Sequence, residues 1–254
     1  MKIIRYVLYD ILRSRMIIGY TAFLLLISAA LFATETNASK SILNLLNIVL
    51  IIVPLVSIIF TTIHYYNSYQ FIELMLAQPI ERIRLLVSEF AGVILSLSAA
   101  FLVGIGIPVL IFSADGAGIS LLLSGVLLTF IFSSIAFWVA AITQDKAKGI
   151  GVALMLWFYF SLIYDFLILF LMFTFSDYPL EKAMLGFTAL NPIDLGRVFV
   201  MLQMDVSAMM GYTGAIYKQF FGSALGMSFA FGVMILWAIL PLYFAIRVFK
   251  KKDF

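Results

Sequence analysis

Cysteine is absent from this 254-residue sequence, which also contains only one histidine, His64. The lack of cysteine excludes disulfides, thiolate metal sites and cysteine nucleophiles, and one histidine cannot form a two-histidine metal motif. No Gly-Lys dipeptide occurs, so the phosphate-binding P-loop is missing as well. We therefore expect no catalytic residues and no bound cofactor in this chain. His64, beside Tyr65 and Tyr66, is expected in an interfacial aromatic belt.

Charge is also scarce. Charged side chains make up 11% of the sequence and hydrophobic ones 64%, whereas soluble domains average about 25% and about 45–50%. So few charges cannot cover a water-facing surface. This composition excludes a water-soluble enzyme, a disordered tail and a nucleic-acid-binding domain, and it predicts a polytopic membrane protein.

Six segments are long and apolar enough to span a bilayer, whose core of about 30 Å needs about 20 helical residues. They contain no basic residue and one acidic residue, Asp165. The alternating segments of about ten residues that build a membrane β-barrel do not occur. The predicted fold is all-α, with spans at 16–33, 42–63, 90–112, 119–142, 150–173 and 224–246.

The basic residues predict how these spans are oriented. Cytoplasmic loops carry an excess of Lys and Arg. Twelve of the sixteen Lys and Arg fall in the amino-terminal segment, in the loops after the second and fourth spans, and in the carboxyl-terminal tail. We therefore expect both termini in the cytoplasm, and the net charge of +3 is a sign of membrane topology, with nothing that supports nucleic-acid binding.

Two segments outside the spans are predicted to be helical. In residues 1–15, apolar side chains recur at helical spacing, which favours an amphipathic helix on the cytoplasmic leaflet; a plain extension of the first span also fits. In residues 64–89 a helical pattern runs to Ala77, and Pro79 then interrupts it. Two short helices joined at Gln78 and Pro79 would dock a cytoplasmic partner, or would lie back on the bilayer without one.

The external segment, residues 174–223, and the fifth span hold further candidates. Asp194 is predicted to cap a helix over 198–204, because carboxylates accept hydrogen bonds from the first N–H groups of a helix. Asp165 has two open interpretations. It lines a translocation path, as acids within spans often do, or it pairs with a polar group of the external segment such as Arg197.

Methionines cluster in the external segment. Thioethers are soft ligands that suit Cu(I), so a metal site is one interpretation. Packing in apolar surroundings is the other. The four residues are Met201, Met204, Met209 and Met210.

The stretch from Glu73 to Arg82 reads Glu-Leu-Met-Leu-Ala-Gln-Pro-Ile-Glu-Arg, and it resembles the first intracellular loop of ABC-2 type transporter permeases. In that family a similar segment forms the coupling helix received by the ATPase subunit. The resemblance implies one permease domain over 1–254, an elbow helix over 1–15 and a coupling loop over 64–89. It also implies a homodimer and a separate ATPase that binds ATP and Mg²⁺. The implied ATPase-coupling residues are Glu73, Leu74, Leu76, Gln78, Pro79, Glu81 and Arg82.

One departure from the family is the lead-in to this motif, where Asn-Ser-Tyr-Gln-Phe-Ile at 67–72 replaces a glutamate-rich Gly-Thr segment. Within the family, an Asn-Pro-x-Asp-x-x-Arg stretch in the external segment is similar to the NosY permeases of Nos ABC transporters, which support maturation of nitrous oxide reductase. The stretch comprises Asn191, Pro192, Asp194 and Arg197. The fifth span, with Trp157, Tyr164 and Asp165, is similar too.

The NosY similarity implies a NosF-like ATPase and a periplasmic NosD-like partner that contacts the Asn-Pro-x-Asp-x-x-Arg stretch. It implies delivery of a small cargo for this copper enzyme across the bacterial cytoplasmic (inner) membrane, with Tyr164 and Asp165 as candidates for the translocation path. One alternative is an ABC-2 permease that exports a lipid, a drug or a peptide. Others are an ion-coupled secondary transporter, which the single intramembrane acid disfavours, and a structural membrane scaffold.

Overall fold

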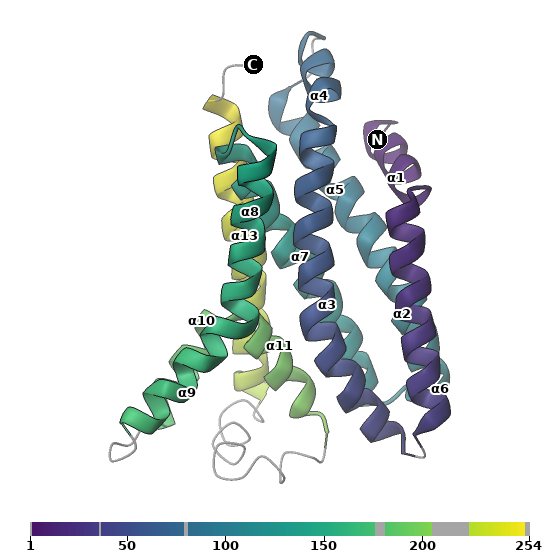
Figure 1. The fold of residues 1–254 in the computed structure, drawn as a ribbon, viewed down its shortest axis with the longest axis vertical. Helices are drawn as coiled ribbons and strands as arrows, with labels where there is room; N and C mark the ends of the chain where they lie inside the picture. The colour runs from purple at the N-terminus through teal and green to yellow at the C-terminus, as the bar shows by residue number, and fades with distance from the viewer. Residues whose placement is uncertain (1, 36, 79–80, 176–180, 205–223, 252–254) are drawn as a thin grey trace.

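The computed structural model describes residues 2–35, 37–78, 81–175, 181–204 and 224–251, and within these ranges every regular element is a helix. Figure 1 shows their arrangement. In chain order the elements are α1 (Lys2–Leu12), α2 (Arg15–Thr34), α3 (Ala38–Asn67), α4 (Tyr69–Leu76), α5 (Arg82–Phe101), the π-helical turn η1 (Leu102–Gly106), α6 (Ile107–Phe112), α7 (Gly116–Ile142), α8 (Lys146–Phe158), the π-helical turn η2 (Tyr159–Ile163), α9 (Tyr164–Thr174), α10 (Glu181–Leu190), α11 (Pro192–Met201) and α13 (Ala224–Lys251).

Six helical stretches of the described chain are long and apolar enough to cross a membrane, as predicted. We refer to them as spans 1 to 6: α2, α3, the continuous α5–η1–α6, α7, the continuous α8–η2–α9, and α13 from Gly226. Three prolines lie inside these stretches without ending them: Pro54 and Pro241 are within α3 and α13, and Pro108 is the second residue of α6, which follows η1. Proline lacks the N–H that a regular helix needs. At Pro108, the wider π-helical turn η1 lies just before the helix that contains the proline.

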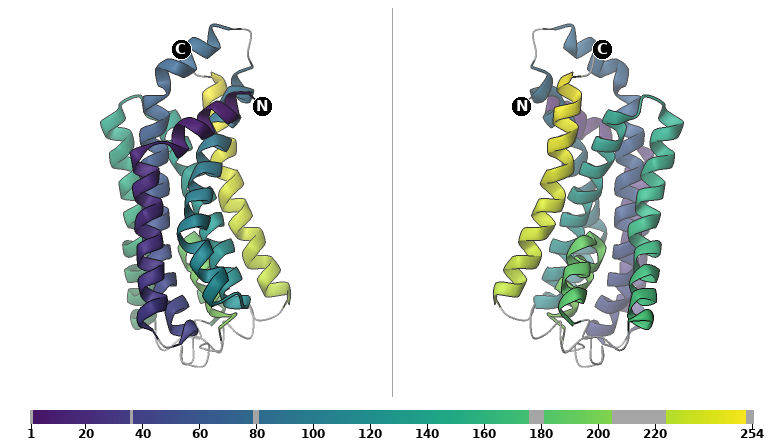
Figure 2. Two further views of the ribbon diagram at one scale, coloured as in Figure 1. Left: turned by 90° about the vertical axis from the view of Figure 1, so that its right-hand side faces the viewer. Right: turned by 90° about the vertical axis from the view of Figure 1, so that its left-hand side faces the viewer.

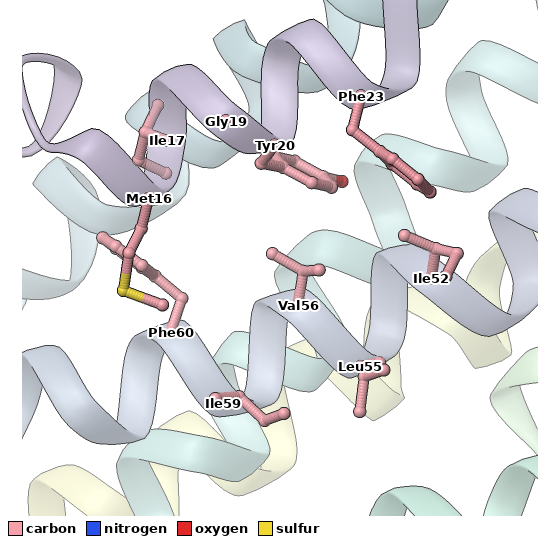
Figure 3. A pocket seen from close by; sticks show the side chains of 10 residues that line it. All are labelled: Met16, Ile17, Gly19, Tyr20, Phe23, Ile52, Leu55, Val56, Ile59 and Phe60. Atoms are coloured by element: carbon pink, nitrogen blue, oxygen red, sulfur yellow. The ribbon is translucent and has the colours of Figure 1, made fainter. Parts of the chain in front are cut away.

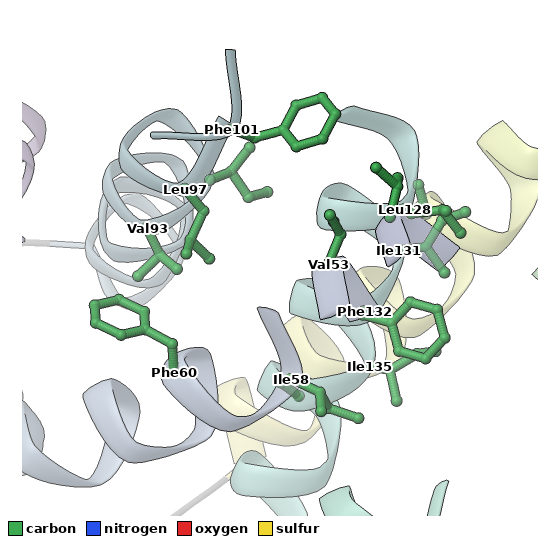
Figure 4. Packing of buried hydrophobic residues seen from close by; sticks show 14 of the residues in the cluster. Val53, Ile58, Phe60, Val93, Leu97, Phe101, Leu128, Ile131, Phe132 and Ile135 are labelled. Carbon is green, nitrogen blue, oxygen red and sulfur yellow. The ribbon is translucent and has the colours of Figure 1, made fainter. Parts of the chain in front are cut away.

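The core is built around α7, which packs against α3, α13, α5 and α11. Figure 4 shows side chains of α3, α5 and α7 that meet in this core. Small residues let these helices approach closely: a Cβ on Gly125 would lie 2.6 Å from a ring carbon of Phe101. The hydroxyl of Thr61 on α3 also donates to Ser133 on α7 at 3.1 Å. Close backbone approach and buried hydrogen bonds therefore hold α7 in the centre.

Both ends of the described chain and α4 lie at the same end of the bundle, whereas α10 and α11 lie in the opposite half (Figures 1 and 2). α1 packs across α5, and Ser14, which accepts a hydrogen bond from Ile17 N at 3.3 Å, caps α2 after the corner. The amphipathic helix expected over 1–15 is therefore present as α1; its position on the membrane surface stays a prediction.

The loop predicted over 64–89 is shorter in the structure. α3 continues through Asn67, so His64 lies in a helix. α5 begins at Arg82, so the second half of the segment is not a separate short helix but the first turns of span 3. The polar residues here suggested a loop, yet α3 and α5 both continue as helices beyond their apolar parts. Only the short α4 protrudes between the two spans.

Candidate functional site

α4 lies at the end of the bundle (Figure 2) and has both buried and exposed side chains. Ile72 is buried, and Met75 packs against the core. Glu73 and Gln78 are exposed, and Leu74 exposes 68% of its surface. An apolar side chain next to polar ones on a protruding helix is typical of a docking surface. We call Glu73, Leu74 and Gln78 the α4 face.

The other predicted coupling residues lie around this face. Leu76 ends α4, and Pro79 falls outside the described residues. Glu81 precedes α5 and pairs with Arg84 at 3.4 Å, with both side chains more than 70% exposed. Arg82 donates a hydrogen bond from Nη1 to the carbonyl of Lys250 at 3.3 Å. The turn after α4 is therefore bound to the last residues of α13.

The base of α4 is held by a polar pair that the sequence did not reveal. Nε2 of His64 on α3 lies 3.2 Å from Oε2 of Glu89 on α5, and Glu89 is only 2% exposed. The Ser68 hydroxyl lies 3.3 Å from the same imidazole nitrogen. His64 is thus an internal hydrogen-bonding residue. His64 lies in the last turn of α3 and contacts Glu89 of α5; its position at the membrane–water interface stays a prediction.

A charge network lies in the opposite half of the molecule. Nη2 of Arg197 lies 3.2 Å from Oδ2 of Asp165, and its Nη1 lies 3.2 Å from Oδ1 of Asp194. The Asn191 amide donates to Oδ2 of Asp194 at 3.1 Å and to the Phe160 carbonyl at 3.0 Å. The pairing of Asp165 with Arg197 is therefore confirmed. A role of Asp165 in a translocation path stays a prediction.

The helix that carries this network begins earlier than predicted. Asn191 caps α11, because its Oδ1 accepts a hydrogen bond from Ile193 N at 3.0 Å. Asp194 lies in the first turn and is not the cap. Pro192 occupies the first helical position, where proline's missing N–H is not needed. Asn-Pro is therefore a helix-start signal here, and the prediction placed the start too late.

Two carboxylates share one guanidinium in this network. Burial of Asp194, together with the Asp165 carboxylate beside it, raises the pKa of Asp194 above its ordinary value of 3.8, and Arg197 opposes this rise. The Tyr164 hydroxyl donates to the Phe187 carbonyl of α10 at 2.6 Å. Through Tyr164 and Asp165, span 5 is therefore tied to α10 and α11.

An apolar groove lies between α2 and α3 (Figure 3). Its volume is about 380 Å³, within the range of about 300–1,000 Å³ typical of ligand sites. The Tyr20 hydroxyl is its main polar group. Such a groove suits an acyl chain or another apolar group. It is lined by Met16, Ile17, Gly19, Tyr20, Phe23, Ile52, Leu55, Val56, Ile59 and Phe60.

The methionine candidates do not gather into a site within the described residues. Met204 is buried in the hydrophobic core and Met201 packs against it, while Met209 and Met210 fall outside the described residues. Among the described residues, no group of three or more His, Cys, Asp or Glu could hold a metal ion. The contacts of Met201 and Met204 favour the packing interpretation.

Residues 70–254 match the model of the ABC-2 family transporter proteins, from α4 through the last helix. The chain belongs to the ABC-2 transporter family. This confirms the family suggested by the motif at Glu73–Arg82 and agrees with six apolar helices in the described chain.

Two curated proteins similar to this chain are both named as NosY permeases. The chain is 26% identical over 189 residues to the probable ABC transporter permease protein NosY of Pseudomonas aeruginosa, covering 70% of this chain and 67% of that protein. It is 24% identical over 232 residues to the probable NosY of Stutzerimonas stutzeri, covering 85% and 82%. The similarity to NosY inferred from short motifs therefore extends over most of the chain.

Proposed function

We propose that this chain is the membrane subunit of an ATP-driven ABC-2 transporter, powered by a separate ATPase that docks on the α4 face. The observation that carries the proposal is the protruding α4 with Leu74 exposed at its outer side, in a family of ABC transporter permeases. ATP and Mg²⁺ would be bound by the ATPase, since this sequence has no P-loop. The chain itself would transmit movement and carry out no chemistry.

The α4 face has the composition of an interface centre. Leu74 would fill a pocket on the ATPase, while Glu73 and Gln78 would form its polar rim. Burying a leucine side chain is worth about 1.5–3 kcal/mol, and each 1.4 kcal/mol corresponds to about tenfold in affinity. Leu74 is therefore expected to raise the affinity for the ATPase roughly tenfold or more.

We propose further that two copies form one transporter. Span 5 is the least covered of the six, with 11% of its most apolar window buried, against 67% for α7, so it is the face that a second copy would cover. Both termini and α4 would lie in the cytoplasm of a bacterial inner-membrane protein, and α10 and α11 would face the periplasm. From the similarity to NosY permeases we infer a NosF-like ATPase, and we propose in addition a NosD-like partner and a cargo for maturation of nitrous oxide reductase.

Co-purification tests the docking proposal. The tagged chain, expressed in its own host and extracted in mild detergent, is expected to bring down an ABC ATPase in stoichiometric amount. Leu74→Asp should reduce the recovered ATPase about tenfold or more, and Leu74→Met should leave it unchanged. Glu73→Lys should reduce it less, with Asp10→Lys, another exposed acid at the same end of the bundle, as the control. Normal ATPase recovery with Leu74→Asp would refute docking at the α4 face.

A second candidate, export of a lipid-like or other apolar compound, is favoured by the groove between α2 and α3. Tyr20→Trp, which would fill that groove, separates the two functions. If the cargo enters the groove, this variant should abolish stimulation of the ATPase by lipid. If the cargo follows the polar network at Asp165, the variant should leave transport unchanged.

A further inference from the structure

The base of α4 is bound to the turn that leads into span 5. Tyr66, in the last turn of α3, donates a hydrogen bond from its hydroxyl to the carbonyl of Thr143 at 2.9 Å. The next residue, Asn67, accepts a hydrogen bond from the Lys146 ammonium at 2.8 Å. Thr143 follows the last residue of α7, and Lys146 begins α8. Two neighbouring residues therefore hold the α7–α8 turn against the start of α4.

The ring of Tyr66 also lies against the backbone of α8. A Cβ on Gly149 would lie 2.7 Å from two ring carbons of Tyr66, a distance that real Cβ atoms essentially never show. Only glycine at this position lets the ring and the helix touch. The first turn of α8 is itself closed by Asp145, whose side chain accepts from Lys148 N at 2.8 Å. Tyr66 therefore contacts a well-ordered helical turn.

The Tyr66 ring is supported from α3 and α7. Tyr65, 1% exposed, meets Tyr66 edge-on at 5.8 Å between ring centroids and meets Phe137 of α7 at 5.5 Å. Edge-to-face pairs at such distances stabilise by about 0.5–1.5 kcal/mol each. The ring cannot rotate away from Gly149 without disturbing Tyr65. We call Tyr66, Asn67, Thr143, Lys146 and Gly149 the Tyr66 latch.

Span 5 is the part of the bundle that such a latch could move most easily. α8 packs on α3 and α7, whereas α9 packs chiefly on η2 of its own span. Within one chain, regions with few buried contacts move at low free-energy cost, whereas α7 is held on several sides by the core; the second copy proposed to cover span 5 would move together with it. A push at α4 would therefore displace α8 and α9 before it displaced α7.

We propose that Tyr66 is a positioning residue that transmits movement of the docked α4 to span 5, through its hydroxyl on Thr143 and its ring on Gly149. The proposal rests on the proposed function, because it needs an ATPase that moves α4. The Lys146–Asn67 hydrogen bond supports the same connection from the other side of the turn. Span 5 carries Asp165, so the latch would link nucleotide binding at one end to the charge network at the other.

The absence of cysteine from the sequence makes the test clean, because two introduced cysteines carry the only spin labels. Met155→Cys on α8 and Leu123→Cys on α7 are both at exposed positions. The distance between these labels is measured by double electron–electron resonance in the complete permease–ATPase complex, with and without ATP and vanadate. Labelled copies are diluted with unlabelled ones, so that only distances within one chain contribute.

The native complex should show a change in this distance on trapping with ATP and vanadate. Tyr66→Phe should reduce the change and Tyr66→Ala should abolish it, while ATPase binding and the nucleotide-free distance stay native. Tyr9→Phe, which removes an exposed hydroxyl at the same end of the bundle, should have no effect. ATP hydrolysis that continues without movement of span 5 would mark a transmission defect, which a merely structural role of Tyr66 would not produce.

Three results would overturn the latch. A full distance change in Tyr66→Ala would show that movement reaches span 5 by another route. A native complex that binds and hydrolyses ATP without any distance change would remove the movement itself, and would leave the proposed function intact. A chain that binds no ATPase at all would overturn the proposed function together with the latch, and the binding assay separates this last case from the other two.

Discussion

Replacing Arg197 by glutamine should destabilise the folded chain, because two carboxylates then face each other without a cation. Asp165, Asp194 and Arg197 expose 34%, 16% and 33% of their side chains. Fully exposed ion pairs contribute about 0.2–1 kcal/mol, and removing one partner of a buried pair costs about 3–5 kcal/mol. The Arg197 network is of intermediate exposure, so we expect Arg197→Gln to lower the free energy of unfolding by about 1–3 kcal/mol.

The matched control is Arg84→Gln. Arg84 pairs with Glu81 at 3.4 Å, close to the 3.2 Å of the Arg197 pairs, but the side chains of Arg84 and Glu81 are both more than 70% exposed. Arg84→Gln should therefore lower the free energy of unfolding by no more than about 0.5 kcal/mol. Adding Asp165→Asn to Arg197→Gln removes the repulsion between the carboxylates and should recover part of the lost stability, giving a coupling energy of about 1 kcal/mol. Thermal unfolding in detergent measures the native chain, Arg84→Gln, Arg197→Gln, Asp165→Asn and the Asp165→Asn/Arg197→Gln double variant.

The pH dependence supplies a second check. The raised pKa of Asp194 means that the folded chain binds this proton more tightly than the unfolded chain does. Its contribution to stability is therefore present at low pH and is lost as pH rises from the ordinary carboxyl range through the raised value. Arg197 opposes the raised pKa, so Arg197→Gln should steepen this loss and should cost less at about pH 5 than at about pH 8. Equal losses in Arg197→Gln and Arg84→Gln, or a loss independent of pH, would refute the network.

Two further substitutions test how the bundle is built. Asn191→Ala removes the cap of α11 and two other hydrogen bonds and should lower the free energy of unfolding by about 2 kcal/mol or more. Asn37→Ala, at the exposed cap of α3, should cost less than half as much in the same melting assay. Equal costs would contradict the role of Asn191 as a buried cap. Gly125→Val would force a side chain into the Phe101 ring and should cost about 1–3 kcal/mol. Combined with Phe101→Ala, which removes that ring, its cost should be smaller than in the native background. A neutral Gly125→Val would contradict the close packing of α5 on α7.

The spans were predictable because their signal is local. Each is a run of apolar residues, and all six appear in the described chain at nearly the predicted places. Their ends were less predictable, because α3 and α5 continue into polar residues that hydropathy assigns to a loop. The α4 protrusion was found from Pro79, since a proline marks a helix boundary by its own geometry.

Contacts between distant residues were not predictable in the same way. The pairing of Asp165 with Arg197 could be proposed because an acid within a span needs a partner. The pairing of His64 with Glu89, and the contact of Tyr66 with Thr143, depend on how three helices lie side by side, and no local pattern contains that. Asn191 as a cap could have been found, because Asn followed by Pro is a helix-start signal.

Cross-linking from the α4 face tests the central claim most directly, that a separate ATPase docks on α4. A photoreactive maleimide is attached to Leu74→Cys on α4, and in a parallel sample to Phe173→Cys, which is 82% exposed on α9. α9 lies in the half of the bundle opposite to α4 (Figure 1), and the sequence has no other cysteine. Irradiation of native membranes should link position 74, and not position 173, to a protein that mass spectrometry identifies as an ABC ATPase. The claim is contradicted if position 74 yields no ATPase, or if both positions yield it equally.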